Sequence, residues 1–237
     1  MKRKVFGSIL VALLVAAGCD GQRPDPKSAL RVASVRTFSS FDPPTPGEKL
    51  TPARAIKFEQ AELAQVLNLY AETSGRSIIR GANVPEVKIT FSNQTPMSAV
   101  ELLQTLDTVL AAQGVTMVVL GTQCVKAVSA NEAHLEAGPV IELEPGQLPD
   151  SSSFLIHIVK LKNVNGSQVP HALQPFAKMA NSIVMIPSGR STTAAAKAAL
   201  PNLPASLFGS QDDILILRDY SSNVRRMLQV LEKMEER

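Results

Sequence analysis

The sequence predicts an α+β fold, built as two small α/β sandwich modules in tandem. Apolar residues recur at helical spacing in several short stretches of the chain. Between them lie brief runs with the apolar alternation or continuity of strands. Glycine and proline mark most of the boundaries. Such dense mixing of short helices and strands favours small sheets that helices cover on one face.

The first module is expected over residues 54–130, in the order β-α-β-β-α-β-β. Its second helix is expected to start at Thr95 as the cap, with Pro96 at the first helical position. Gly75 and Gly114 are expected to end the two helices, because glycine adopts positive φ at little cost. Strands are expected at residues 56–59, 77–80, 86–91, 115–120 and 124–128. The first helix carries its apolar stripe at Leu63, Val66, Leu67 and Tyr70.

The second module is expected over residues 154–237, in the order β-α-β-β-α, with an insertion at 188–210. Ser167 can cap its first helix, which Pro175 should kink or end. The continuous apolar run at 213–217 predicts a strand buried on both faces. Ser221 or Ser222 is expected to cap the final helix. Other strands are expected at 154–161 and 182–186, and the final helix has its apolar stripe at Val224, Met227, Leu228, Leu231 and Met234.

The remaining segments predict export and tethering. Residues 1–18 have the basic start and short apolar run of a signal peptide. The residues up to Cys19 resemble a bacterial lipobox, which implies lipid attachment at Cys19 in the inner or outer membrane. An ordinary secretory signal or an uncleaved anchor remain alternatives. Residues 19–53 are proline-rich and predict a flexible tether, and residues 131–153 predict a linker.

Charge and composition argue against nucleic-acid partners. The chain has 24 Lys and Arg and 21 Asp and Glu, for a net charge of +3. Removing the signal peptide takes away Lys2, Arg3 and Lys4, so 24 − 3 leaves 21 basic residues against 21 acidic ones. A neutral mature chain lacks the excess of positive charge that is typical of nucleic-acid-binding proteins.

No motif of catalysis, metal binding or cofactor binding stands out. His134, His157 and His171 lack the spacing of metal ligands. Cys124 is expected to be a partly buried, inert thiol, because no histidine is placed to activate it. We therefore expect no catalytic residues, no metal, no cofactor and no enzymatic activity.

Several stretches resemble a known family. Residues 61–76, 87–91 and 99–103 resemble the first periplasmic module of secretins, which also occurs as the short N-terminal domain of TonB-dependent receptors. Residues 157–164 and 213–228 resemble the KH-like secretin ring module. Together they resemble the N-terminal half of a type II secretion secretin, the general secretion pathway protein D family.

The resemblance implies a function in protein export. The first module would dock onto inner-membrane secretion components, and the second would pack into a homo-oligomeric ring with secretin barrel subunits. The chain stops at Arg237, before any secretin barrel, which predicts a separate subunit or a piece of a longer secretin. Only Gly166 stands where a KH domain has its GxxG clamp, so nucleic acid is not expected.

The resemblance also gives candidate contact residues. The alternative function is a free-standing periplasmic lipoprotein that binds a peptide, a cell-wall fragment or a receptor signal. The residues expected to dock a partner are Leu63, Leu67, Tyr70, Val87, Ile89 and Phe91. Those expected to mediate self-association are His157, Lys160, Arg218, Arg225 and Arg226.

Overall fold

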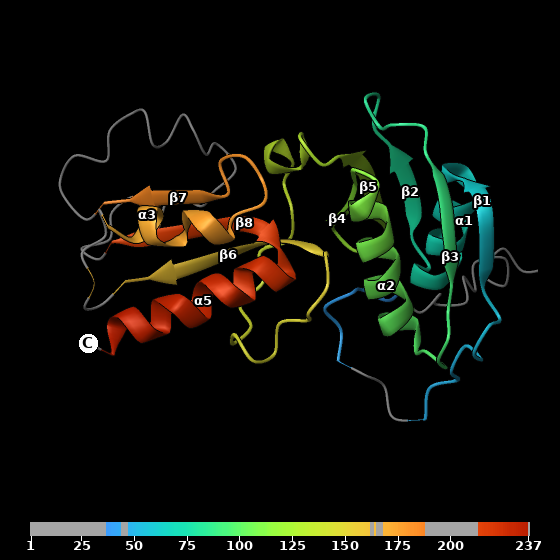
Figure 1. Cartoon of the computed structure of the whole chain (residues 1–237), viewed down its shortest axis with the longest axis horizontal. Coiled ribbons are helices and arrows are strands. Elements are labelled where there is room, and N and C mark those ends of the chain that lie inside the picture. The colour runs from blue at the N-terminus through green and yellow to red at the C-terminus, as the bar shows by residue number, and fades with distance from the viewer. Residues whose placement is uncertain (1–36, 44–46, 162–163, 165–167, 188–212, 237) are drawn as a thin grey trace, which may run out of the picture. The chain divides into compact units, whose positions relative to one another are not determined.

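The computed structural model describes residues 37–43, 47–161, 164, 168–187 and 213–236. It confirms the α+β class, with helices and three small sheets in the order that the sequence predicts (Figure 1). The described residues all belong to one compact unit, and the expected boundaries between separate domains stay a prediction. Cys19, the signal peptide, Ser167 and the insertion at 188–210 lie outside the described residues.

The first half of the described chain has the expected β-α-β-β-α-β-β order. Its helices are α1 (Leu63–Ser74) and α2 (Ala99–Ala112). Its strands are β1 (Lys57–Glu62), β2 (Ser77–Arg80), β3 (Lys88–Ser92), β4 (Val115–Leu120) and β5 (Cys124–Ser129).

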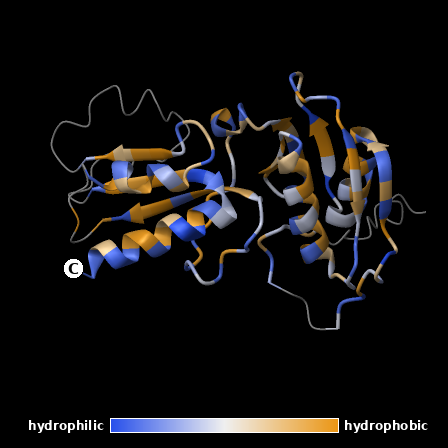
Figure 2. Cartoon of the chain, in the orientation of Figure 1, coloured by the Kyte–Doolittle hydropathy of each residue, from blue (hydrophilic) through white to orange (hydrophobic). Residues whose placement is uncertain are grey.

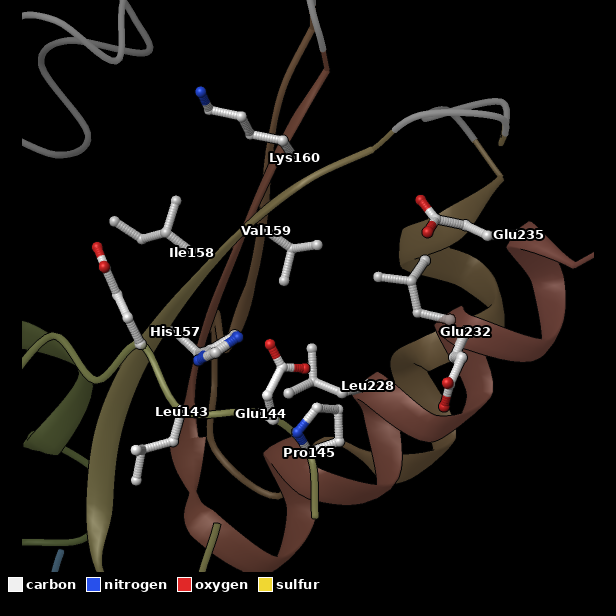
Figure 3. A pocket seen from close by; sticks show the side chains of 12 residues that line it. Leu143, Glu144, Pro145, His157, Ile158, Val159, Lys160, Leu228, Glu232 and Glu235 are labelled. Atoms are coloured by element: carbon white, nitrogen blue, oxygen red, sulfur yellow. The ribbon is translucent and has the colours of Figure 1, made fainter. Parts of the chain in front are cut away.

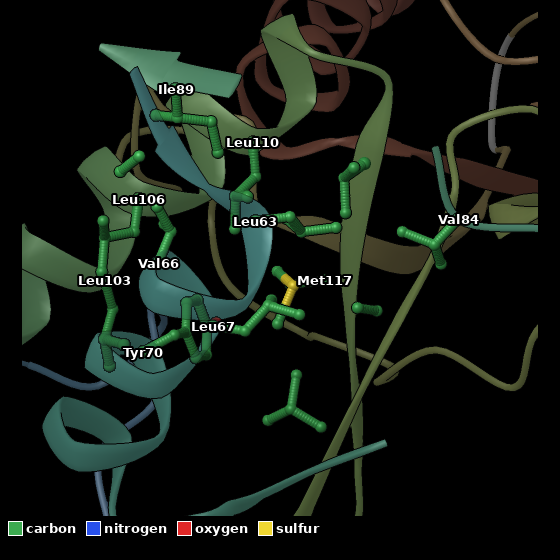
Figure 4. Close-up of a cluster of buried hydrophobic side chains, with 14 of the residues drawn as sticks. Leu63, Val66, Leu67, Tyr70, Val84, Ile89, Leu103, Leu106, Leu110 and Met117 are labelled. Atoms are coloured by element: carbon green, nitrogen blue, oxygen red, sulfur yellow. The ribbon is translucent and has the colours of Figure 1, made fainter. Parts of the chain in front are cut away.

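These strands form two sheets, and the helices lie between them. β1 and β3 pair antiparallel as a two-stranded ribbon. In the other sheet, β5 lies between β2, which is parallel to it, and β4, which is antiparallel. The core side chains come from both helices, from the ribbon and from the three-stranded sheet (Figure 4). The aliphatic stripes of α1 and α2 are buried in this core, as their periodicity predicts.

The helix ends confirm one local sequence signal and correct another. Gly75 follows α1 with φ of 66°, and its N–H donates to the Ala71 carbonyl at 2.9 Å. The start of α2 was predicted wrongly at Thr95. The cap is Ser98, whose hydroxyl accepts from the Glu101 N–H at 3.2 Å, while the Ser98 N–H donates to the Glu101 carboxylate at 2.8 Å. This reciprocal capping box satisfies two helix-terminal donors, which Thr95 cannot do from outside the turn.

The described residues of the second half have the expected β-α-β-β-α order, with α3 and α5 packed on one face of the sheet β6-β8-β7. The predicted effect of Pro175 is confirmed, because α3 ends before it and a 3₁₀ turn follows. Figure 2 shows the apolar and polar sides of α5. The elements are β6 (Phe154–Lys160), α3 (Val169–Leu173), η2 (Gln174–Phe176), β7 (Ile183–Ile186), β8 (Ile214–Tyr220) and α5 (Ser221–Glu235).

Strand β8 is buried on both faces, as its continuous apolar run predicts. Leu215 and Leu217 belong to the cluster beneath the helices. Ile214 and Ile216 belong to a second cluster on the opposite face. Both antiparallel pairings of β8 hold it in the centre of its sheet.

The start of α5 corrects the expected serine cap. The residue before the helix is Tyr220, and no side chain caps it. The Ser221 hydroxyl instead donates to the Pro149 carbonyl at 2.5 Å. The buried Asp219 carboxylate, at the end of β8, accepts from the Tyr220 N–H at 2.7 Å and from the Asn223 amide at 2.9 Å. Asp219 therefore anchors the strand-to-helix turn.

The expected tether is attached to the folded unit over its described part. The Phe38 N–H donates to the Ser74 carbonyl at 2.9 Å, and Thr51 forms an antiparallel bridge with Met97. The buried Asn93 amide donates to the Pro52 carbonyl at 2.7 Å. Residues 37–43 and 47–53 therefore make long-range contacts with the folded unit, and the flexible character expected for residues 19–53 stays a prediction.

The expected linker at 131–153 is also packed against the fold. Leu148 is 1% exposed and lies in the core beneath α3 and α5. Val140 makes a parallel bridge with Ile156, and the Ile141 N–H donates to the Ile156 carbonyl at 2.9 Å. The linker thus borders the sheet of the second half instead of simply connecting the halves.

Candidate functional site

The ribbon of β1 and β3 presents a polar outer surface. Phe58 and Phe91 lie opposite each other in the register and are half-buried, which places their rings against the core. The exposed positions of the two strands alternate with buried Ala61 and Ile89. Since β1 and β3 pair only with each other among the described strands, each has a free edge. The exposed residues are Lys57, Glu59, Gln60, Glu62, Lys88 and Thr90.

The ribbon is irregular at its centre. The register shifts between Phe58 and Ala61, and Gln60 has a positive φ of 55°. The Gln60 N–H and its side-chain amide both donate to the Thr90 hydroxyl at 3.3 Å. Such bulges turn side chains outward and interrupt an edge, and they are common at functional positions.

The structure corrects most of the predicted docking residues. Leu63, Leu67, Tyr70 and Ile89 are at most 6% exposed and form the core of the first half (Figure 4). Buried side chains hold the fold together and cannot touch a partner in this conformation. Val87 and Phe91 are half-buried and pack against the same core. The surface that remains for docking is made by the polar neighbours of these residues on the ribbon.

The predicted self-association residues do not form one patch. His157 is 9% exposed, and its Nδ1 lies 2.6 Å from the Ile141 carbonyl, so its side chain serves the packing of residues 139–143. Arg225 is half-buried, whereas Lys160 and Arg226 are exposed. Only these last two offer a free surface for a neighbouring subunit.

Arg218 has an internal role. Its guanidinium donates to the His134 carbonyl at 3.2 Å and to the Asn181 carbonyl at 2.9 Å. Burial lowers the pKa of Arg218 from its usual value. The side chain therefore holds the loops of His134 and Asn181 beside β8, so two of its donors are already used within the fold.

The sequence reasoning missed a buried carboxylate on α2. Oδ2 of Asp107 accepts from the Ser40 hydroxyl at 2.6 Å and from the Ser153 hydroxyl at 2.5 Å. Burial raises the pKa of Asp107 from 3.8 to about 6, and hydrogen bonds from Ser153, Ser40 and Tyr70 offset part of that rise. Asp107 thus joins three segments that are distant in sequence. The available signal was an aspartate on the buried stripe of α2, between Leu106 and Leu110.

A mixed cluster connects the two halves. The Thr116 and Tyr220 hydroxyls lie 2.9 Å apart and are hydrogen-bonded in a buried setting. Around them pack Val118 and Val128 from the first half and Phe154 from the second. This contact makes β4 and the end of β8 parts of one core.

An open groove lies between the edge of β6 and helix α5. It has a volume of about 440 Å³. Figure 3 shows the side chains that line it. Val159 from β6 and Leu228 and Leu231 from α5 give it an apolar floor. Glu142, Glu144, Glu232 and Glu235 line it together with Lys160, which makes it acidic overall.

The described residues contain none of the usual signs of a metal site or a membrane span. Within residues 37–43, 47–161, 164, 168–187 and 213–236, no group of three or more His, Cys, Asp or Glu side chains is placed to hold a metal ion. In the same part of the chain no helix is long and apolar enough to cross a bilayer. Cys124 is half-buried, as expected.

A family model matches part of the first half of the described chain. The family model "GspD-like, N0 domain" matches residues 56–127. These residues cover β1 to β5 almost completely, so they include the ribbon, both core helices and the three-stranded sheet. No curated protein matches the chain.

Solved structures show distant similarity. The GspC–GspD complex of the type II secretion system of enterotoxigenic Escherichia coli is 14% identical, over 80% of this chain and 100% of that one, with a TM-score of 0.30. The N0 domain of the type II secretin from the same organism is 23% identical, over 35% of this chain and 99% of that one, with a TM-score of 0.32.

The outer-membrane complex of the Klebsiella pneumoniae type II secretion system, with PulD, PulS and the PulC HR domain, is 15% identical. That match covers 75% of this chain and 38% of the other, with a TM-score of 0.42. The chain therefore spans well under two thirds of that relative. Because these TM-scores are below 0.5, the identification depends on the family match of residues 56–127.

Proposed function

We propose that the chain is a periplasmic component of a secretin complex, because the GspD-like N0 domain model matches residues 56–127. It acts in protein export through a type II secretion or type IV pilus-like apparatus. Its work is protein–protein contact. The family match is the observation that carries this proposal.

Secretin N-terminal domains are structural components of secretion machinery and not enzymes. The chain is accordingly no enzyme. Its function therefore depends on the surfaces that contact other proteins.

The ribbon is the surface that we assign to the inner-membrane secretion partner. Its exposed side chains carry both charges, with Lys57 and Lys88 beside Glu59 and Glu62. Both strand edges are free among the described residues, and an edge can accept a further strand. The buried neighbours, such as Leu63 and Ile89, keep the ribbon rigid against the helices.

The second half is assigned to contacts between subunits. We infer a KH-like ring module over residues 154–237, in which Lys160 and Arg226 remain available for a neighbour. A lipid at Cys19 would hold the mature chain on the inner or outer membrane. The β-α-β-β-α order of β6 to α5 supports this assignment.

Photo-crosslinking in the periplasm of the native host tests the ribbon. A photoreactive residue replaces Thr90, which is exposed on β3, and in a matched control it replaces Gln229, which is exposed on α5. We expect the Thr90 position to give a covalent adduct with an inner-membrane protein of the secretion apparatus, identified by mass spectrometry. The Gln229 position should not give that adduct. Equal yields at both positions, or no such adduct at Thr90, would refute docking on the ribbon.

The mass of the full chain in detergent tests the ring. Analytical ultracentrifugation, alone and with a secretin subunit, should show oligomers. Strictly monomeric behaviour in both conditions would remove the ring from the proposal and favour a free-standing lipoprotein.

A further inference from the structure

Strand β6 is paired along its whole length on one side only. There it pairs antiparallel with β8 from Phe154 to Lys160. On the other side the pairing begins with residues 139–141 and then stops. The Ile156 N–H donates to the Pro139 carbonyl at 2.8 Å, and the Ile156 carbonyl accepts from the Ile141 N–H at 2.9 Å.

The pairing pattern shows which backbone groups face the open edge. The Leu161 N–H donates to the Asp213 carbonyl, so the backbone N–H and C=O groups of odd-numbered residues in this strand point toward β8. The hydrogen bonds of Ile156 show that the backbone groups of even-numbered residues point away from β8. The N–H and C=O groups of Ile158 and Lys160 therefore face away from β8. They have no hydrogen-bond partner within the part of the chain that the structure describes.

The groove beside this edge combines an apolar floor with an acidic rim. Figure 3 shows Val159 on β6 and Leu228 on α5 on facing sides of it, with Glu144 and Glu232 at its border. Glu142 lies on the same segment as Glu144. These three carboxylates face one ammonium group, that of Lys160, so the groove favours a cationic occupant.

We propose that the β6 edge from Ile158 to Lys160 binds an extended, basic segment of a partner protein, which adds to the sheet as a further strand. The partner's backbone would form hydrogen bonds with the outward N–H and C=O groups of Ile158 and Lys160, and these bonds do not depend on the partner's side chains. Alternate side chains of the added strand would point into the groove. Lysine or arginine suits these positions, because the aliphatic stem can lie on Val159 and Leu228 while the charge reaches Glu232.

This site is separate from the ribbon, so its test does not depend on the docking of an inner-membrane component. The probe is a fluorescent peptide of alternating lysine and valine with blocked ends. Its controls are the same peptide with glutamate for lysine and one with proline at the central valines. Binding to the full chain in detergent is measured by fluorescence anisotropy at low and high salt.

Charge reversal on the rim is the first variant. Glu232→Lys lies on the exposed side of α5, and Glu72→Lys makes the same change on the exposed side of α1, away from the groove. We expect Glu232→Lys to weaken peptide binding at least fivefold at low salt and Glu72→Lys to leave it unchanged. Equal weakening by both variants would mean non-specific attraction and would overturn the proposal.

The second variant tests strand addition itself. Ile158→Pro removes an outward N–H, which an edge strand tolerates, while the bonds to β8 stay in place. Met185→Pro is the matched control on β7. The Arg218 N–H donates to the Ser182 carbonyl, so the backbone N–H and C=O groups of even-numbered β7 residues point toward β8. The backbone N–H of Met185 therefore points away from β8. We expect only Ile158→Pro to lose binding, with circular dichroism confirming that both variants fold.

Two further results would overturn the inference. One is equal binding of the proline-containing peptide and the lysine–valine peptide. The other is crosslinking of the β6 edge to a second copy of the chain that the peptide cannot displace, because the occupant would then be this protein itself.

Discussion

Asp107 is the residue whose environment has the clearest thermodynamic consequence. Its carboxylate is buried where the N-terminal segment, α2 and the start of β6 meet, and its pKa is raised from 3.8 to about 6. Ser40, Ser153 and Tyr70 surround it, and no basic side chain contributes to its shifted pKa. Ionisation is therefore disfavoured mainly by the loss of water.

The folded state should bind one more proton than the unfolded state between about pH 4 and pH 6. Stability should fall as the pH rises through this window, because the folded pKa is the higher one. The total loss is roughly 3 kcal/mol, from a shift of about two pKa units. Asp107→Asn should remove this dependence of the free energy of unfolding on pH and should raise the stability at pH 8. Urea unfolding at pH 4, 5, 6 and 8 measures both effects.

The exposed Asp150 provides the matched control. Asp150→Asn should keep the pH slope of the natural chain. If Asp107→Asn retained the slope as well, another group would be responsible for it.

At the scale of single elements, helix α2 depends on its capping box. Ser98→Ala removes the acceptor for the Glu101 N–H, which should cost about 1 kcal/mol in the free energy of unfolding. Thr95→Ala alters the exposed residue that looked like the cap in the sequence, and should change it by less than about 0.5 kcal/mol. Chemical denaturation of both variants measures the difference. A larger cost at Thr95 than at Ser98 would contradict this account of the helix start.

The element order could be predicted because it depends on local patterns. The apolar stripes of α1 and α5 and the alternation of β3 can be recognised from residues that are close in sequence. The start of α2 was missed because two serine or threonine candidates lie close together. The glutamate three residues after Ser98 was the deciding signal, and it was present in the sequence.

What could not be predicted depends on contacts between distant residues. Nothing near Ser40 indicates that its hydroxyl reaches Asp107, and the proline-rich composition around it favours a free tether. The docking residues were mistaken for a similar reason. A helical stripe such as Leu63 and Leu67 shows which face is apolar, but only the packed structure shows that the ribbon covers it.

At the scale of the whole molecule, the hydrogen bond between Thr116 and Tyr220 couples the two halves. Thr116→Val and Tyr220→Phe should each lower the free energy of unfolding by about 1 kcal/mol. The double variant should cost less than their sum, because both remove the same bond. A double-mutant cycle by urea unfolding measures this coupling. Strict additivity would show that the halves are energetically independent at this point.

The segment at 37–43 has a mechanical consequence. Phe38 packs in the core of the first half and Phe41 against that of the second, while Ser40 is bonded to Asp107 between them. A pulling force applied to the chain before residue 37 would act first on this segment, which is held by the Phe38–Ser74 and Ser40–Asp107 hydrogen bonds. Such a load would therefore act on the hydrogen bonds of Phe38 and Ser40 before it reached the strand pairings of the sheets.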